Sequence, residues 1–142
     1  MILLPATLLR RIAIVAREAY PEECCGLLIG FREPNGQVRV TEIAESSNVA
    51  PPPLRNRFEV DPALRFAVMR RLSHGRDQIV GHYHSHPDGL AEPSRHDAAM
   101  AYEPELLWLI VAVRAGVAGE AAAFRYDPSI HSWRTVPISE GD

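Results

Sequence analysis

The stretch from His82 to Asp97 reads HYHSHPDGLAEPSRHD, and it predicts the local fold around which the rest of the chain can be arranged. The segment from Gln78 to His84 has the composition of a strand. Ser85 to Pro93 contains two prolines and a glycine, which predicts a loop. Ser94 can then cap a short helix that runs to about Tyr102. We therefore expect a strand, a loop and a helix in direct succession.

This succession brings together side chains that can hold a metal ion. His84 and His86 are two residues apart at the end of the predicted strand, so both project from the same face. The loop can fold back so that Asp97, in the first turn of the helix, offers a third ligand. Three protein ligands and one water are typical of catalytic zinc, which lowers the pKa of that water to about 7. The same donors also suit other divalent metals.

A hydrolytic metal site also needs a group that carries protons between the water and the leaving amine. Glu22 and Glu23 are the candidates, and the chemistry alone does not choose between them. A tetrahedral intermediate needs a hydrogen-bond donor for its oxyanion, and the hydroxyl of Ser94 could fill that position. These residues together predict metal-assisted hydrolysis of an amide or isopeptide bond.

The same residues resemble the signature of the JAMM family of metalloproteases, also called MPN+. In that signature a distant Glu precedes His-Ser/Thr-His, seven residues, Ser, two residues and Asp. His84, Ser85, His86, Ser94 and Asp97 fit the pattern without insertion. The resemblance implies a zinc metallopeptidase with one Zn²⁺ per chain, held by the two histidines and the aspartate, and an oxyanion donor at Ser94.

A second match lies near the start of the chain. Glu23-Cys24-Cys25-Gly26 resembles the Glu-x-x-Gly with which the family enters its central strand. This match selects Glu23 over Glu22 as the catalytic acid and base. The adjacent thiols of Cys24 and Cys25 read as reduced, and packing in the core is favoured over a role as nucleophile.

The order of the other predicted elements also resembles the family's fold. We expect one domain over residues 1–142 with the mixed α/β, cytidine-deaminase-like MPN fold, in which about six strands are flanked by two longer helices and one short helix. The elements expected besides those above are a helix over Ala6–Tyr20, strands over Cys24–Gly30 and Gln37–Glu45 joined by a turn at Pro34–Gly36, a short strand over Arg57–Val60, a helix capped by Asp61 that ends before Gly75, and strands over Glu105–Val113, Ala121–Tyr126 and Trp133–Ile138.

The segment from Ser46 to Asn56, which contains three consecutive prolines, predicts an extended surface loop. Long irregular loops beside a site often bind substrate, although a plain surface loop is an equal alternative. We take Asn48, Arg57 and Phe58 as candidate substrate contacts on this basis.

Each assignment has a simpler structural alternative. Ser94 to Asp97 also fits a helix capping box, in which both side chains bond to the backbone. His82 lies on the same strand face as His84, but a structural histidine is the favoured interpretation. Ser85 should face the opposite side and form a structural hydrogen bond.

Composition excludes several other classes of function. The formal net charge is -3 without long runs of one sign, so neither nucleic acid nor an anionic membrane is an expected partner. The N-terminal apolar stretch lacks the features of a signal peptide, and we expect a cytoplasmic protein of unknown oligomeric state.

The resemblance is to short, bacterial-type single-domain members of the family. It implies cleavage at the C-terminal glycine of a ubiquitin-like or sulfur-carrier protein with a β-grasp fold and a di-glycine type tail. Two alternatives are a peptidase of this family that acts on another peptide or conjugate, and a catalytically silent scaffold of the same fold.

Overall fold

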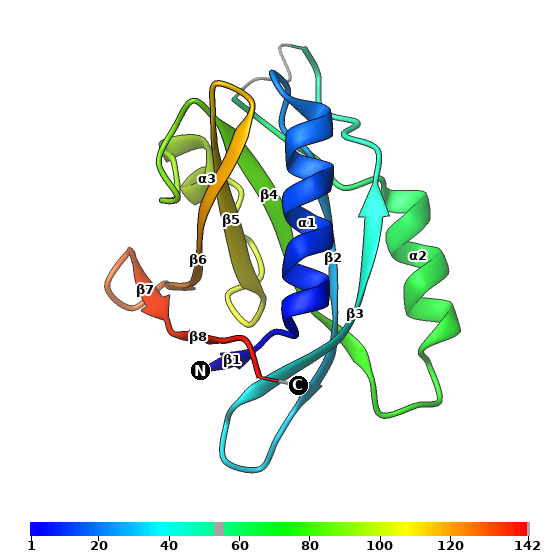
Figure 1. The fold of residues 1–142 in the computed structure, drawn as a ribbon. Coiled ribbons are helices and arrows are strands. Elements are labelled where there is room, and N and C mark those ends of the chain that lie inside the picture. Colours follow the sequence, from blue (N-terminus) through cyan, green and yellow to red (C-terminus); the bar gives the residue numbers. More distant parts are fainter. Residues whose placement is uncertain (53–55, 142) are drawn as a thin grey trace.

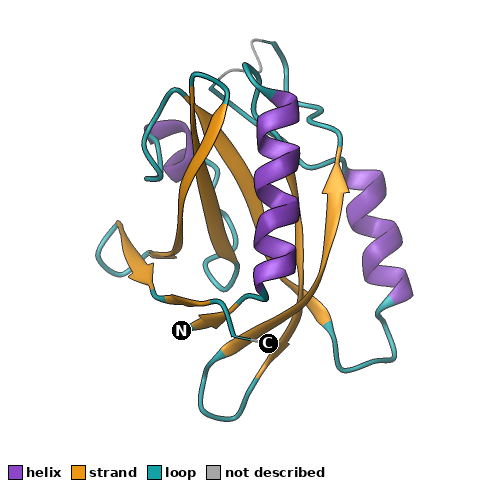
Figure 2. Ribbon diagram, viewed as in Figure 1, coloured by secondary structure: helices purple, strands orange, loops and turns teal. Residues whose placement is uncertain are grey.

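The computed structural model describes residues 1–52 and 56–141, and over these residues the chain forms three helices and one eight-stranded mixed sheet (Figures 1 and 2). The strand order is β7-β6-β5-β4-β2-β3-β1-β8. In chain order the elements are β1 (Ile2–Leu3), α1 (Ala6–Ala19), β2 (Cys25–Arg32), β3 (Val38–Ser46), α2 (Pro62–Arg71), β4 (Gln78–Pro87), α3 (Arg95–Ala99), β5 (Leu107–Arg114), β6 (Val117–Asp127), β7 (Ser132–Val136) and β8 (Ile138–Ser139). The predicted mixed α/β fold class is confirmed.

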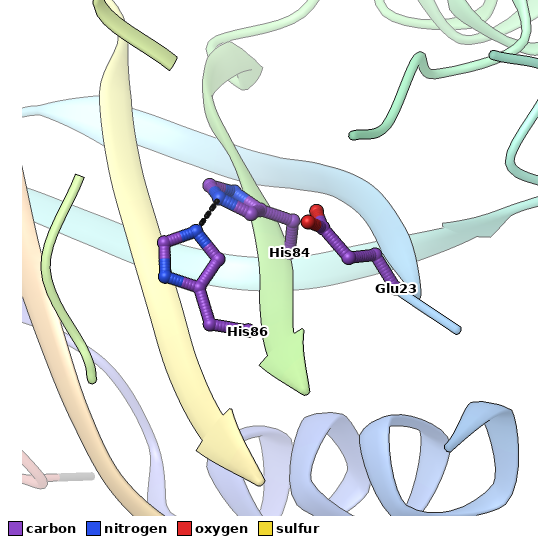
Figure 3. Close-up of side chains that lie close together, drawn as sticks. All are labelled: Glu23, His84 and His86. Atoms are coloured by element: carbon purple, nitrogen blue, oxygen red, sulfur yellow. Dashed lines mark hydrogen bonds between the residues drawn. The ribbon is translucent and has the colours of Figure 1, made fainter. Parts of the chain in front are cut away.

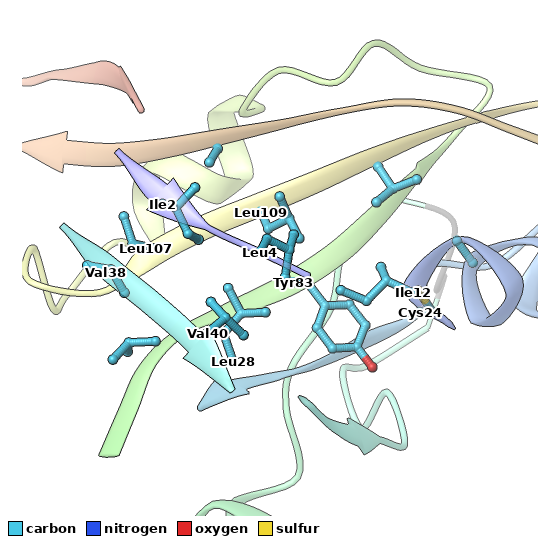
Figure 4. Close-up of a cluster of buried hydrophobic side chains, with 14 of the residues drawn as sticks. Ile2, Leu4, Ile12, Cys24, Leu28, Val38, Val40, Tyr83, Leu107 and Leu109 are labelled. Atoms are coloured by element: carbon cyan, nitrogen blue, oxygen red, sulfur yellow. The ribbon is translucent and has the colours of Figure 1, made fainter. Parts of the chain in front are cut away.

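Helix α1 packs across one face of the sheet and builds the main core there (Figures 1 and 4). Its buried residues Ile12 and Ala16 are one turn apart, as expected for a helix with one apolar side. Alternate residues of the strands face this helix, because successive side chains of a strand point to opposite faces. The largest fully buried side chains on this face are Tyr83, Ile2, Leu4, Ile12, Leu28, Leu107, Leu109, Val38 and Val40.

The opposite face carries two smaller apolar clusters. One packs Val68 of α2 against Leu27 and Ile29 of β2. The other contains Cys25, Phe58, Trp108, Ile110 and Phe124. Helix α2 begins as predicted, because the Asp61 side chain accepts a hydrogen bond from the Ala63 amide and proline occupies the first turn.

Strand β4, in the middle of the sheet, carries the candidate ligands His84 and His86. It runs antiparallel to β2 and parallel to β5, and the pairing with β5 continues to Pro87 opposite Val113. Tyr83 lies opposite Gly26, where a Cβ atom would lie 2.4 Å from the tyrosine ring. Glycine is therefore required three residues after Glu23 so that β2 and β4 can pair at this register.

Several predicted boundaries are corrected by the structure. The sheet has eight strands instead of about six. The two additional strands, β1 and β8, pair in parallel and are only two residues long, too short for a sequence pattern to indicate. Residues 57–60 form no strand, and only Val60 makes an isolated bridge, to Asn48. Strand β4 extends past His84 to Pro87 because β5 pairs with it, so the following loop begins later than predicted.

The predicted helix after Ser94 is also shorter, since α3 ends at Ala99. Among the three prolines of the predicted loop, Pro53 lies outside the described residues. None of the helices found within residues 1–52 and 56–141 has the length and apolar character needed to span a membrane.

Candidate metal centre

The two histidines at the end of β4 point to a common centre, as Figure 3 shows. The Nε2 atoms of His84 and His86 are 3.1 Å apart. Oδ2 of Asp97, in the first turn of α3, lies 3.3 Å from Nε2 of His84 and 3.1 Å from Nε2 of His86. His84 and Asp97 are buried, and His86 is half-buried. The structure therefore brings together the three residues that the sequence predicted as ligands.

These separations fit a bound metal ion. Two donors on a tetrahedral zinc with bonds of about 2.0 to 2.1 Å are about 3.3 to 3.4 Å apart. The three atoms of His84, His86 and Asp97 lie within a few tenths of an ångström of that spacing. Two imidazole nitrogens and one carboxylate oxygen are also a common ligand set for divalent transition metals. The residues present thus suit a metal ion.

Glu23 completes the group from the other side. Its carboxylate lies within 4.8 Å of ring nitrogens of both His84 and His86, so Glu23 is itself a possible ligand by distance (Figure 3). Oδ2 of Asp97 contacts Nε2 of both histidines directly. Glu23 therefore faces the same centre as the three predicted ligands.

The environment of Glu23 favours a proton on its carboxyl group. The side chain is 4% exposed, and Oε1 has no hydrogen-bond partner within the described part of the chain. Burial raises the pKa of Glu23 to about 8, the nearby charge of His86 lowers it, and that of Asp97 raises it further. Glu22 is exposed, so the structure separates the two candidates that the chemistry left open.

The opposite holds for Asp97. Burial alone would raise the pKa of Asp97, but hydrogen bonds with His84 and His86 outweigh burial and hold it far below its usual range. Burial lowers the pKa of His84, which favours the neutral imidazole. Burial also acts to lower the pKa of His86, but its bonds to Asp97 and the Leu90 carbonyl raise it overall. An ionised Asp97 and a neutral His84 are the forms that bind metals, and a metal ion at this centre would take the place of any proton on Nε2 of His86.

The loop after β4 orients His86. Nδ1 of His86 lies 2.9 Å from the carbonyl oxygen of Leu90, and a hydrogen bond donated there leaves the Nε2 lone pair facing the centre. Asp88 anchors this loop at φ 56°, accepting hydrogen bonds from the Tyr20 hydroxyl and the Ala115 amide. We did not predict this support, although Asp88-Gly89 is a recognisable turn signal.

Ser94 forms the capping box that the sequence offered as an alternative. Its Oγ accepts a hydrogen bond from the Asp97 amide at 3.0 Å, and its own amide donates to Oδ2 of Asp97 at 2.8 Å. The cap therefore fixes the carboxylate that faces the histidines. A serine hydroxyl that accepts one bond can still donate its hydrogen, so capping and oxyanion stabilisation are compatible.

Aromatic rings form the wall behind His84. The Phe58 ring stacks on the His84 ring at 4.1 Å between centroids and an angle of 16°. His82 packs against Trp108 at 4.3 Å, and burial lowers the pKa of His82 to about 3. His82, Trp108 and Phe58 also line a cavity of about 380 Å³ between the sheet and α2.

The remaining predicted residues occupy structural positions around the site. Ser85 accepts a hydrogen bond from the Cys24 amide at 2.9 Å, on the face opposite the histidines. Cys24 and Cys25 are free, buried thiols whose pKa values burial raises to about 11 and about 12, which argues against nucleophilic thiolates. Asn48 bonds to the backbone around Glu23, and Arg57 is half-buried with no partner for Nε among the described residues.

Named relatives share parts of the sequence. The chain is 36% identical over 90 residues to the desampylase of Haloferax volcanii, an alignment that covers 63% of this chain and 62% of that protein. It is 28% identical over 141 residues to the CysO-cysteine peptidase of Mycobacterium tuberculosis, covering 99% of this chain and 85% of the relative.

Solved structures agree with the fold. A protein of Desulfitobacterium hafniense superposes with a TM-score of 0.83 at 26% identity and covers 98% of this chain and 92% of its own. A JAB1/MPN domain protein of Archaeoglobus fulgidus, at 18% identity and a TM-score of 0.60 over 96% of this chain and 95% of its own, supports the MPN-type fold alone. The family model of prokaryotic homologs of the JAB domain matches residues 5–134, and this chain belongs to that family.

Proposed function

We propose that the chain is a zinc metallopeptidase that hydrolyses a peptide or isopeptide bond at the C-terminal glycine of a ubiquitin-like or sulfur-carrier protein. The observation that carries this proposal is the convergence of Nε2 of His84, Nε2 of His86 and Oδ2 of Asp97 beside the buried carboxyl of Glu23. Membership of the JAB family, together with relatives named desampylase and CysO-cysteine peptidase, supports the choice of reaction and substrate.

In this proposal His84, His86 and Asp97 hold one Zn²⁺. When bound, the ion supplies a lowered water pKa and a polarised scissile carbonyl. The protein's own contribution is to fix three donors before the ion arrives. The Ser94 cap and the Leu90 carbonyl hold Asp97 and His86 in orientations that face the centre.

Glu23 is the proposed acid and base. Burial raises the pKa of Glu23 to about 8 in the metal-free protein, and the charge of a bound cation would lower it, so the group can both accept and donate a proton near neutral pH. Oε1, which has no hydrogen-bond partner among the described residues, can accept the proton of the attacking water and pass it to the leaving amine. Ser94 is the proposed donor to the oxyanion of the tetrahedral intermediate.

The proposed substrate enters as an extended C-terminal tail. A di-glycine type tail is narrow and flexible, so it can lie close to a recessed site such as this one. Arg57, whose Nε is buried without a partner in the described part of the chain, is a proposed contact for the tail. Free buried thiols at Cys24 and Cys25 are consistent with the proposed cytoplasmic location.

The proposal can be tested with two defined substrates. A sulfur-carrier protein extended by one cysteine, and the same carrier joined by an isopeptide bond to a lysine peptide, are incubated with zinc-loaded protein and followed by intact mass. We expect cleavage after the terminal glycine of the carrier in at least one substrate. The rate of cleavage by Glu23→Gln should be about 10²- to 10⁴-fold lower than that of wild type. A zinc-loaded protein that cleaves neither substrate would contradict the proposed function.

A further inference from the structure

We propose that Asn48 is a positioning residue. Its side-chain amide holds the backbone of Glu23, and it supports the ring of His84 indirectly, through Phe58. This inference rests on the proposed function for its catalytic consequence, but its structural part concerns the chain alone. It assigns Asn48 and Phe58 a role in assembling the site, in place of the substrate contact suggested by their place in the sequence.

The Asn48 side chain has no hydrogen-bonding capacity left for a substrate. Its Nδ2 donates to the backbone carbonyls of Glu23 at 3.2 Å and Arg57 at 3.0 Å. Its Oδ1 accepts from the amides of Ala50 at 3.1 Å and Glu59 at 3.0 Å. An asparagine amide has two donor hydrogens and two acceptor lone pairs, so these four bonds use all of them.

These bonds join three parts of the backbone at one point. Ala50 lies two residues after Asn48, Arg57 and Glu59 lie on the far side of the Pro-rich loop, and Glu23 precedes β2. The two sides of the loop are also held by the Val49 amide, which donates to the Glu59 carbonyl at 3.0 Å. The buried Sγ of Cys25 lies 3.7 Å from that same carbonyl. The segment from Arg57 to Glu59 is therefore fixed relative to Glu23.

Phe58 lies between the two residues that Asn48 binds, and its ring stacks on His84. Nδ1 of His84 is buried without a hydrogen-bond partner among the described residues, whereas Nδ1 of His86 is paired with the Leu90 carbonyl. A ligating histidine is usually oriented by a hydrogen bond from its second nitrogen. For His84 the aromatic ring takes that role, because Phe58 is 9% exposed and cannot move aside without opening the core.

The chain of contacts thus runs from the amide of Asn48 to the backbone of Glu23 in one direction and to the ring of His84 in the other. One side chain sets the distance between the proton carrier and a metal ligand. Small displacements of reacting groups reduce rates strongly, which predicts an effect on turnover rather than on substrate binding.

The test uses Asn48→Asp and Phe58→Leu, with Val49→Ala as the matched control. Val49 belongs to the same segment, and its side chain is 43% exposed, so its loss should change nothing. Asn48→Asp places an oxygen against the carbonyls of Glu23 and Arg57 and breaks both donated bonds. We expect kcat on the carrier–cysteine substrate to fall about 10- to 100-fold with KM nearly unchanged, and the acidic limb of the kcat pH profile to move.

Two readouts need no peptidase activity. Zinc affinity, measured by competition with a chromophoric chelator, should fall about 10-fold or more for Phe58→Leu and stay at the wild-type value for Val49→Ala. Hydrogen exchange of the Glu59 amide should accelerate in a third variant, Asn48→Ala, which removes the Oδ1 acceptor of that amide, and remain slow in the control. If wild type binds zinc but cleaves no substrate, the proposed function fails, while these two readouts still decide the present inference.

A raised KM with unchanged kcat in either variant would identify a substrate contact and overturn the inference. So would a lower melting temperature accompanied by unchanged zinc affinity, Glu59 exchange and pH profile, because that result would describe only a structural residue.

Discussion

The two faces of the central sheet differ in what they bury. Toward α1, β4 presents Tyr83 within an apolar core (Figure 4), and Ser85 on the same face accepts a hydrogen bond from the Cys24 amide. On the other face the same strand presents His84 and His86, which share their surroundings with the buried carboxyl of Glu23 (Figure 3). The first face contributes the main core, whereas the second combines two smaller apolar clusters with ionisable groups that would be better hydrated in an unfolded chain. The main core thus lies on the face away from the site, and only the smaller clusters pack beside it.

The largest expected effect comes from shortening a buried side chain on the face of the sheet that packs against α1. Leu109 is fully buried there, and Leu109→Ala should lower the free energy of unfolding by about 2 to 5 kcal/mol through lost burial and a cavity. Zinc affinity at a temperature well below the melting point should stay near that of wild type, because the side chain faces away from the histidines. Denaturant unfolding and chelator competition measure the two quantities. A large loss of zinc affinity with little loss of stability would show that the two faces are not separate in function.

On the opposite face, replacing the ionisable carboxyl of Glu23 should increase the stability of the protein by an amount that depends on pH. In the folded, metal-free protein the pKa of Glu23 is about 8 against an ordinary 4.5, so folding retains a proton that the unfolded chain releases between those values. Stability due to this group therefore falls as pH rises from about 4.5 to about 8. Metal-free Glu23→Gln avoids this loss, and its melting temperature should exceed that of wild type by an amount that grows over this window and then levels off.

Melting curves of both proteins at pH 4, 6, 8 and 9 with a chelator present would check this expectation. The two should coincide at the lowest pH, which serves as the internal control. A constant difference at every pH would mean that Glu23 is not the titrating group.

The smallest change in stability is expected at Tyr83, whose hydroxyl is a polar group on the face of the sheet that packs against α1. Its hydroxyl is buried with no partner among residues 1–52 and 56–141. Tyr83→Phe should therefore leave stability unchanged or raise it by up to about 1 kcal/mol, because a buried hydroxyl without a partner contributes nothing favourable. Thermal unfolding would detect the change, and a clear destabilisation would indicate that the hydroxyl has a partner after all.

The sequence predicted the helices and the long strands because their patterns are repeated over several turns or residues. It also predicted that three candidate ligands converge, since strand alternation places His84 and His86 on one face and the helix cap places Asp97 beside them. It could not indicate β1 and β8, which are two residues long and depend on pairing between distant parts of the chain. The strand proposed for 57–60 is wrong because Phe58 packs on His84 instead of joining a ladder.

Loop positions were harder to assign than strand positions. Asn48 was selected because it lies in an irregular segment, but its four bonds to the backbone depend on where that segment folds. The raised pKa of Glu23 likewise depends on burial that no local pattern reports. Residue type and spacing thus identified the candidate ligands, and tertiary contacts were needed to show which neighbouring groups orient them.

The central claim is that His84, His86 and Asp97 hold one metal ion. The most direct test is the zinc content of protein purified without added metal, measured by elemental analysis for wild type, His84→Ala and Asp97→Ala. The exposed His74 provides the matched control as His74→Ala. We expect about one zinc per chain in wild type and in the control, and its loss in both site variants. A wild type that contains no zinc and takes up none on titration, or site variants that retain it fully, would show that these three residues do not hold a metal ion.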